Sequence, residues 1–140
     1  MDDAAARARV ADARVGHLAT VTADGRPHVV PCCFVLDGDT IYSAVDDKPK
    51  RTTALKRLDN VRANAVAELV VDYYDDTRWS ELWWVRVSGA ARVVDDADEE
   101  RRARELLTAK YPQYRKQPPP GVVLAIAVAR WRTWSADGFG

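Results

Sequence analysis

A cluster of basic residues just before a short predicted helix is the first candidate site in the chain. Lys48, Lys50 and Arg51 stand close together, and Thr52 or Thr53 is placed to cap the helix. Backbone N–H groups at a helix start, a hydroxyl group and cationic side chains together bind anions. The cluster therefore predicts a site for a phosphate or a phosphodiester. A solvated basic loop would show the same spacing.

A proline inside an apolar strand marks a second candidate site. Residues 29–34 (VVPCCF) have the composition of a strand, but Pro31 has no N–H group to donate to a neighbouring strand. Backbone groups left without a partner could hydrogen-bond the edge of a flat heterocycle. A kinked edge strand would explain the pattern equally. Cys32 and Cys33 are adjacent, so their side chains point to opposite faces and no disulfide between them is expected.

The predicted strand 82–94 carries aromatic residues on both of its faces. Alternation places Trp83 and Val85 on one face, and Trp84 and Arg86 on the other. One face is expected to pack in the core, while the other could meet a partner chain. Arg86 is then a surface residue, an ion-pair donor at an interface or a contact for an acidic substrate.

No arrangement of nucleophile, base and acid is visible in the sequence. His17 and His28 lie at or on predicted strands and are expected to be structural. There is no glycine-rich phosphate loop, no HExxH motif and no Cys-x-x-Cys pair. Two cysteines and two histidines supply no evident metal-ligand set, so no metal is expected. Any chemistry is therefore expected from a bound cofactor, which the protein orients.

The elements that position these residues alternate as in a mainly antiparallel β domain with added helices. Turns are expected at Asp24-Gly25 and Asp37-Gly38, and a bulge or bend at Gly89. Asp96 and Glu99 resemble a capping box before a charged helix. The length fits one domain over residues 1–140. We expect helices at 2–14, 52–59 and 96–111, six strands at 17–22, 27–36, 40–45, 66–74, 82–94 and 122–128, and a proline-rich loop at 112–120.

The overall composition excludes several classes of function. Apolar residues make up 47% of the chain, and 21 basic side chains balance 21 acidic ones. Binding to nucleic acid or to an anionic membrane through bulk charge is therefore not expected. No apolar run approaches the roughly 18 residues that span a bilayer. Residues 1–14 lack the apolar segment of a secretory signal, and the cysteines are expected to be reduced thiols, so the cytoplasm is the expected location.

Three stretches, taken in order, resemble the pyridoxamine 5′-phosphate oxidase-like superfamily of flavin and deazaflavin proteins. They are HLATVTADGRPHVVPCCFVLDGDTIY, DDKPKRTTALKRL and VAELVVDYYDDTRWSELWWVRVSGAARV. The resemblance covers about residues 17–134 and is greatest to the actinobacterial F420-dependent branch, the flavin/deazaflavin oxidoreductase B group. It implies a six-stranded antiparallel split β-barrel of the FMN-binding type. It also implies a homodimer with two equivalent cofactor sites at the interface.

The resemblance further implies roles for individual residues. The phosphate-bearing part of the cofactor would lie on Lys48, Lys50, Arg51 and Thr52. The tricyclic ring would lie against the second strand, and the partner chain would add aromatic contacts. The implied ring contacts are Val30, Pro31, Cys32 and Cys33, and the candidate partner contacts are Trp79 and Trp131.

Three functions remain as alternatives. The first is a coenzyme F420-dependent reductase that transfers a hydride to a small conjugated or heteroaromatic acceptor. The second is an FMN-dependent enzyme like pyridoxamine phosphate oxidase, although the further arginines that such oxidases use have no full counterpart here. The third is a non-catalytic protein that binds F420, a flavin or haem. No catalytic residue is assigned in any of them.

Overall fold

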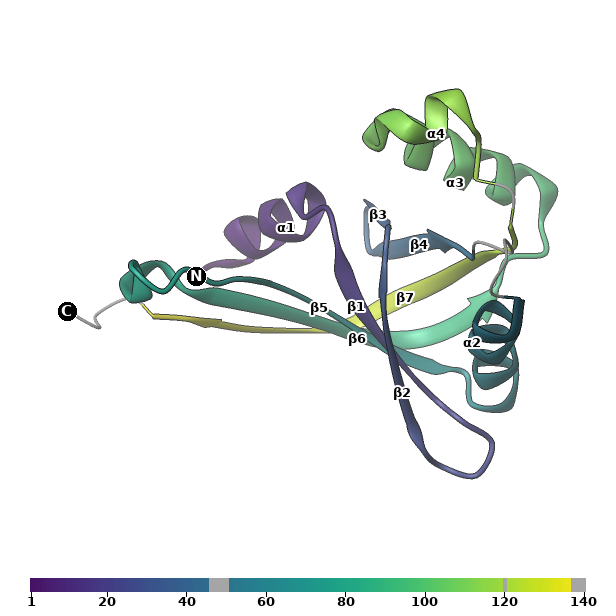
Figure 1. Cartoon of the computed structure of the whole chain (residues 1–140), viewed down its shortest axis with the longest axis horizontal. Coiled ribbons are helices and arrows are strands. Elements are labelled where there is room, and N and C mark those ends of the chain that lie inside the picture. The colour runs from purple at the N-terminus through teal and green to yellow at the C-terminus, as the bar shows by residue number, and fades with distance from the viewer. Residues whose placement is uncertain (46–50, 120, 137–140) are drawn as a thin grey trace.

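The computed structural model describes residues 1–45, 51–119 and 121–136, and for residues 51–55 it describes the backbone alone. Within these residues, seven strands form one antiparallel sheet in the spatial order β2-β1-β5-β6-β7-β4-β3. The sheet curls into a half barrel with helices packed around it (Figure 1). The strands are β1 Gly16–Val21, β2 Pro27–Cys32, β3 Val35–Asp37, β4 Thr40–Ala44, β5 Val66–Tyr73, β6 Trp83–Val93 and β7 Val123–Ser135. The helices are α1 Asp3–Asp12, α2 Arg51–Ala63, α3 Ala97–Lys110 and α4 Pro112–Lys116, with a 3₁₀ helix at Trp79–Glu81.

The mainly β, antiparallel architecture is as predicted, but the strand count of six is wrong. The expected strand 27–36 is broken at Cys33 and Phe34, so that β2 and β3 lie on opposite edges of the sheet. The chain turns inward here because the Phe34 side chain is fully buried in the core. The last expected strand, 122–128, instead continues through 130–134 as the single strand β7.

The strands β5, β6 and β7 extend beyond the barrel as a three-stranded ribbon, which we call the arm (Figure 1). The pairing of β6 with β7 shifts between Ser88 and Gly89, as predicted. A Cβ atom at Gly89 would lie 1.8 Å from the carbonyl oxygen of Ala127, so only glycine fits the shift. Such a bulge increases local twist, which suits the point where the barrel passes into the arm.

The helices follow local signals, with two differences from the prediction. Asp2 and Asp96 cap α1 and α3 through their side chains. The helix α2 continues past residue 59, because Asn60 and Val61 are buried against the sheet. The expected loop 112–120 contains the short helix α4, which begins at Pro112, where the missing proline N–H removes no helical hydrogen bond.

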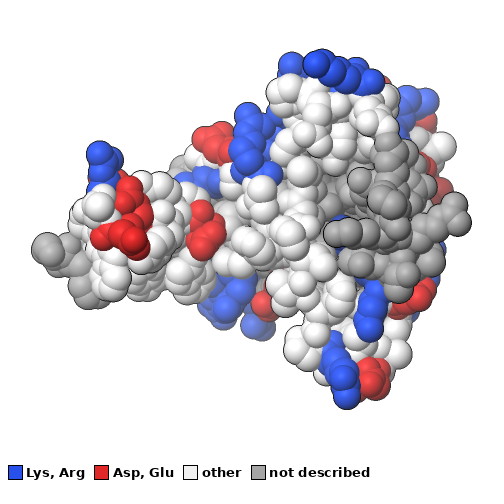
Figure 2. Space-filling model, viewed as in Figure 1, with Lys and Arg blue, Asp and Glu red and all other residues white. Residues whose placement is uncertain are grey.

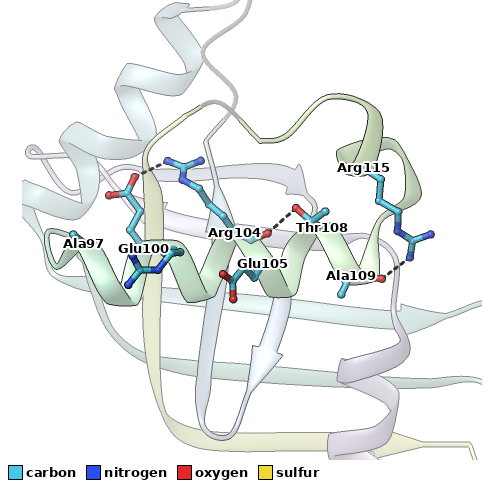
Figure 3. Close-up of a pocket in the computed structure, with 8 residues that line it drawn as sticks. Ala97, Glu100, Arg104, Glu105, Thr108, Ala109 and Arg115 are labelled. Atoms are coloured by element: carbon cyan, nitrogen blue, oxygen red, sulfur yellow. Dashed lines mark hydrogen bonds and ion pairs between the residues drawn. The ribbon is translucent and has the colours of Figure 1, made fainter.

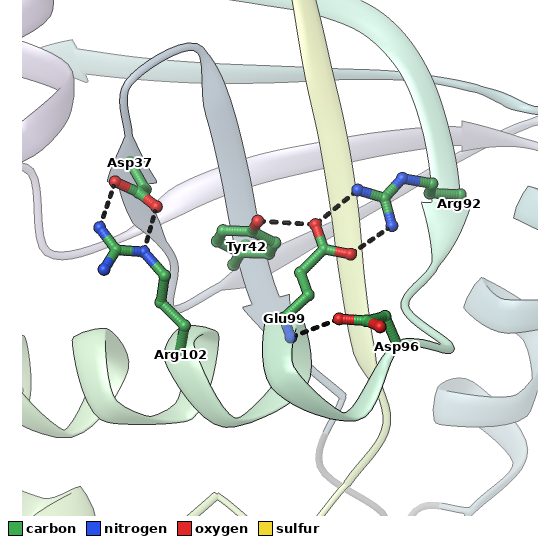
Figure 4. A network of polar contacts seen from close by, with 6 residues as sticks. All are labelled: Asp37, Tyr42, Arg92, Asp96, Glu99 and Arg102. Carbon is green, nitrogen blue, oxygen red and sulfur yellow. Dashed lines mark hydrogen bonds and ion pairs between the residues drawn. The ribbon is translucent and has the colours of Figure 1, made fainter.

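A polar network fastens α3 to the sheet (Figure 4). Glu99 does not reach back to its capping residue as a full capping box would. Its carboxylate instead accepts hydrogen bonds from Arg92 at 2.8 and 2.6 Å and from Tyr42 at 2.8 Å. Nearby, Arg102 donates to Asp37 at 2.9 and 3.1 Å. The hydrogen bonds from Arg92 and Tyr42 lower the pKa of Glu99 to about 2.

This network predicts a pH-dependent contribution to stability. The pKa of Glu99 is lower in the folded than in the unfolded chain, so its stabilisation is complete above about pH 5 and is lost as the pH falls toward about 2. Glu99→Gln should therefore lower the free energy of unfolding by about 2 kcal/mol at pH 7, and the difference should shrink in acid. Urea unfolding between pH 7 and pH 3 measures it. Glu105→Gln, an exposed change on the same helix, is the control, and a pH-independent difference would contradict the prediction.

Candidate cofactor site

The strand β2 offers a free backbone edge. In the described part of the chain it pairs with β1 alone, so the edge position, one of the alternatives left open by Pro31, is the one found. The side chains of Val30 and Cys32 turn inward and pack against the core, whereas Val29 and Pro31 are exposed. A flat ligand lying along this strand would therefore meet its backbone groups and the ring of Pro31. The inward side chains could support the strand only from behind.

Both cysteines are free thiols, and Cys32 is expected to have low reactivity. Cys32 packs against the main core cluster, while Cys33 packs against a second cluster beneath α3. Burial raises the pKa of Cys32 to about 11 and outweighs the opposing effects of Ser43 and Arg57. The thiol stays protonated at neutral pH, so nucleophilic chemistry at this position is not expected.

Basic groups from α2 lie beside β2. The pKa of His28 is lowered by burial and by the charges of Lys56 and Arg57, which favours a neutral imidazole at neutral pH. The Nδ1 atom of His28 and the Nε atom of Arg57 are buried, and neither has a hydrogen-bond partner among the described residues. Buried polar atoms are nearly always hydrogen-bonded in native proteins, so this pair suits a polar ligand or water.

Arg57 is a site candidate that the sequence interpretation missed. It is half buried and close enough to affect the pKa of both His28 and Cys32. The signal was present in the helical spacing, because positions 57, 60 and 61 share one face of a helix. Asn60 and Val61 are buried, and Asn60 donates to Thr20 of β1 at 3.1 Å, so this face is turned toward the sheet.

The predicted phosphate site lies mostly beyond the described atoms. Lys48 and Lys50 lie outside the described residues, and the side chains of Arg51 and Thr52 are not described. The helix α2 begins at Arg51, so the basic cluster does lie at a helix start as predicted. The predicted cap at Thr52 or Thr53 is wrong, because both residues lie within the first turn of α2. The structure therefore brings together β2 and the face of α2 that carries Arg57. The assignment of phosphate to residues 48–52 stays a prediction.

The two tryptophans predicted to contact the cofactor lie elsewhere in the chain. Trp79 is 63% exposed in the 3₁₀ helix where β5 passes into β6, at the far end of the arm from β2 (Figure 1). Trp131 pairs across the sheet with Val87 and packs against the core, and the guanidinium of Arg7 lies 4.8 Å from its ring centre. Neither is brought to β2 within one chain, so both stay predictions about the partner chain.

The outer face of the arm is aromatic and hollowed. A hollow of about 460 Å³ there is lined by residues of all three arm strands, including Trp84 and Trp134. Tyr74, which also lines the hollow, is 61% exposed. Arg86 lies over the ring of Trp84 at 5.5 Å and 3.8 Å from Glu68, so within its own chain it is a surface residue with an ion-pair partner. The expected division of strand 82–94 into a core face and an open face is confirmed, because Val85 and Val87 are fully buried.

A larger hollow between α3 and α4, about 600 Å³, contains none of the predicted site residues (Figure 3). Arg104, on its wall, donates to the carbonyl oxygens of Pro119 and Gly121 and to Glu100. Arg115 donates to the carbonyl oxygen of Ala109 at 2.8 Å. Both arginines are bonded to carbonyl or carboxylate oxygens of the chain itself and are not turned toward a ligand. The hollow is therefore not taken as the candidate site.

Two features are absent from the described residues, a metal-ligand cluster and a membrane-spanning helix. They contain no group of three or more histidine, cysteine, aspartate or glutamate side chains arranged to hold a metal ion. No helix in the described ranges is long and apolar enough to cross a membrane. Figure 2 shows lysine and arginine side chains at several separate places on one face of the molecule.

Comparison with known proteins gives a family and a fold. The family model described as pyridoxamine 5′-phosphate oxidase matches residues 2–135, and no curated protein sequence matches the chain. The conserved hypothetical protein Rv2991 from Mycobacterium tuberculosis aligns with a TM-score of 0.76 and 21% identity, over 97% of this chain and 86% of that one. A candidate 5-nitroimidazole antibiotic resistance protein from Bacteroides thetaiotaomicron gives 0.74 and 15%, over 94% and 82%. An FAD-binding protein from Mesorhizobium loti gives 0.71 and 20%, over 95% and 94%.

The chemistry of Cys32 leads to a prediction. A pKa of about 11, against an ordinary 9.0, leaves about a hundredfold less thiolate at pH 8. In the Cys33→Ser protein, whose only thiol is Cys32, alkylation by iodoacetamide should therefore be slower by about that factor in the folded than in the urea-unfolded chain. Mass spectrometry of timed samples measures both rates. Equal rates would mean that Cys32 is exposed and that β2 is not packed as described.

Proposed function

Because the chain belongs to the pyridoxamine 5′-phosphate oxidase family, we propose that it is an oxidoreductase that uses coenzyme F420. In this proposal it transfers a hydride from the reduced cofactor to a small conjugated or heteroaromatic acceptor. The observation that carries the proposal is the free edge of β2 beside the basic face of α2. A cytoplasmic location is part of the same proposal.

The residues around β2 suit a ligand with a flat ring and an anionic tail. The ring would lie along the backbone of Val30–Cys33, with Pro31 against it. The buried Nε atom of Arg57 and Nδ1 atom of His28 are available for polar atoms between ring and tail. The tail phosphate would bind to Lys48, Lys50, Arg51 and Thr52 at the start of α2, where helix dipole and positive charge act together.

The protein and the cofactor have separate tasks in this proposal. Reduced coenzyme F420 supplies a hydride to an electron-poor carbon of the acceptor. The chain holds the ring flat on β2, so that ring and acceptor stack at about 3–3.5 Å. The protonated thiol of Cys32 and the neutral imidazole favoured at His28 add no charge next to the ring. No side chain is assigned as a proton donor.

We further propose that the working form is a homodimer. β1 pairs with β5 only over His17–Ala19, and β4 pairs with β7 only as far as Ala127, so both edges of the arm run on without a neighbouring strand in the described residues. Free strand edges and exposed aromatic rings are usually covered. A second chain packed on the arm would cover them and bring its own Trp79 toward β2. Trp131 already has the Arg7 guanidinium 4.8 Å from its ring centre, so a ligand would share or displace this contact.

A flavin is the second candidate cofactor. The name of the FAD-binding neighbour from Mesorhizobium loti favours it, since that protein shares the fold over nearly its whole length. The neighbour linked to 5-nitroimidazole resistance suits a heteroaromatic acceptor with either cofactor. Coenzyme F420 is preferred because the three sequence stretches resemble the F420-dependent branch of the superfamily most.

Direct titration tests the proposal. Purified protein should be colourless, should bind coenzyme F420 more tightly than FMN or FAD, and should oxidise the reduced cofactor when a nitroheteroaromatic acceptor is added. Fluorescence and absorbance measure binding and turnover. Yellow protein with a flavin spectrum would select the flavin alternative, and a Soret band would indicate haem. Tight F420 binding without turnover on a broad acceptor panel would indicate a carrier.

The phosphate assignment is tested separately. Lys50→Ala combined with Arg51→Ala should weaken F420 binding by about 3 kcal/mol or more, because two charge-assisted contacts are lost. Arg62→Ala, an exposed arginine on the same helix, is the matched control and should bind like wild type. Size-exclusion chromatography should give the same oligomeric state for all three proteins. Unchanged affinity in the double variant would remove residues 50 and 51 from the site.

A further inference from the structure

The backbone of Phe34, between β2 and β3, is held by the end of α3. Its N–H group donates to the Tyr111 hydroxyl at 3.0 Å, and its carbonyl oxygen accepts from Lys110 Nζ at 2.9 Å. The Tyr111 hydroxyl oxygen also lies 3.0 Å from the carbonyl oxygens of Phe34 and Arg14. Tyr111 and Lys110 thus bind both backbone groups of the residue at which the chain changes direction. We call this arrangement the Phe34 clip.

The clip replaces hydrogen bonds that a sheet would otherwise supply. β2 pairs with β1 no further than Cys32, and β3 begins at Val35 on the opposite edge. The carbonyl oxygen of Cys33 accepts a hydrogen bond from the Ser43 hydroxyl at 2.7 Å. The clip supplies the hydrogen bonds of Phe34. The Lys110 ammonium also lies 4.1 Å from the centre of the Phe34 ring. The path of the chain after the end of β2 is therefore set by side chains that are distant in sequence.

We propose that Lys110 and Tyr111 are positioning residues for the cofactor, acting through the backbone of Phe34. The inference rests on the proposed function, because it takes β2 as the support of the ring. Neither residue lies on β2 or in α2, and neither is assigned contact with cofactor or acceptor. Their task is to keep the backbone edge that follows Pro31 at a fixed angle.

The charge of Lys110 gives the clip a pH dependence. The groups that face it are Arg14 and Asp12 near the end of α1, the two cysteines and Tyr111. Burial and the charge of Arg14 lower the pKa of Lys110 to about 8. Above this pH the bond to Phe34 loses its charge assistance, so the affinity for the cofactor should fall. Since the folded-state pKa lies below the unfolded one, the contribution of Lys110 to stability rises over the same pH range.

With rising pH the affinity for the cofactor should fall while the contribution of Lys110 to stability rises. This difference separates a positioning role from a purely stabilising one. Lys110→Met and Tyr111→Phe should each raise the dissociation constant for coenzyme F420 about tenfold at pH 7, and Lys110→Arg should restore most of the loss for Lys110. The ratio of the dissociation constant of Lys110→Met to that of wild type should be smaller at pH 9 than at pH 7. FMN is titrated in parallel, and the comparison at each pH cancels ionisation of the cofactor itself. Glu105→Gln, an exposed change on α3 that touches neither Phe34 nor the Glu99 network, is the control and should bind normally.

Hydrogen exchange in ligand-free protein distinguishes the possible failures. The Phe34 amide should be protected in wild type and exchange faster in Tyr111→Phe, measured by NMR at one pH. Faster exchange with unchanged affinity for the cofactor would show that the clip is structural only, and would overturn the inference while leaving the proposed function intact. If neither F420 nor FMN binds to wild type, the proposed function fails and the inference fails with it. Unchanged exchange in the variant would refute the clip itself.

Discussion

The fold depends on how the chain crosses from one edge of the sheet to the other between β2 and β3. The two peptide groups at the crossing, those of Cys33 and Phe34, lie where no neighbouring strand can pair with them. Leaving such groups unpaired in a protein interior costs about 1–3 kcal/mol each. Ser43 on β4 binds the carbonyl oxygen of Cys33, and Lys110 and Tyr111 at the end of α3 bind the carbonyl oxygen and the N–H group of Phe34. The position of β2 therefore depends on the docking of α3, and the Glu99 network holds α3 in place.

The candidate site combines the free edge of β2, whose inward side chains pack on the core, with the helix α2, which packs against the sheet. The helix α2 contacts β1 and β6, which keeps its Arg57 face against the barrel rather than in solvent. A partly buried cation interacts more strongly with an anionic ligand than an exposed one, because less water screens it. The same burial lowers the pKa of His28 and raises that of Cys32. Positive charge beside β2 thus comes from Lys56 and Arg57 of α2 rather than from His28.

The features predicted correctly are those decided by local backbone chemistry. The turn at Gly25 has a positive φ of 88°, the shift at Gly89 leaves no room for a Cβ atom, and the side chain of Asp96 caps α3. The missed features depend on residues far away in sequence. The break at Phe34 needs Tyr111, and the inward turn of Arg57 needs the packing of α2 on the sheet. Glu99 formed only half of its expected capping box because Arg92 and Tyr42 offered its carboxylate stronger partners.

The proposed homodimer depends on the arm. Its exposed aromatic end, with Trp79, lies far along the ribbon from β2 of the same chain (Figure 1). In a two-fold symmetric pair the same surface serves both chains, so an arm that reaches the partner's β2 implies that the partner's arm reaches back. Each ring site would then have a rigid strand from one chain and an aromatic cover from the other. Acceptor specificity would follow from the arm, while cofactor binding would follow from β2 and α2, so the two properties could change independently in sequence.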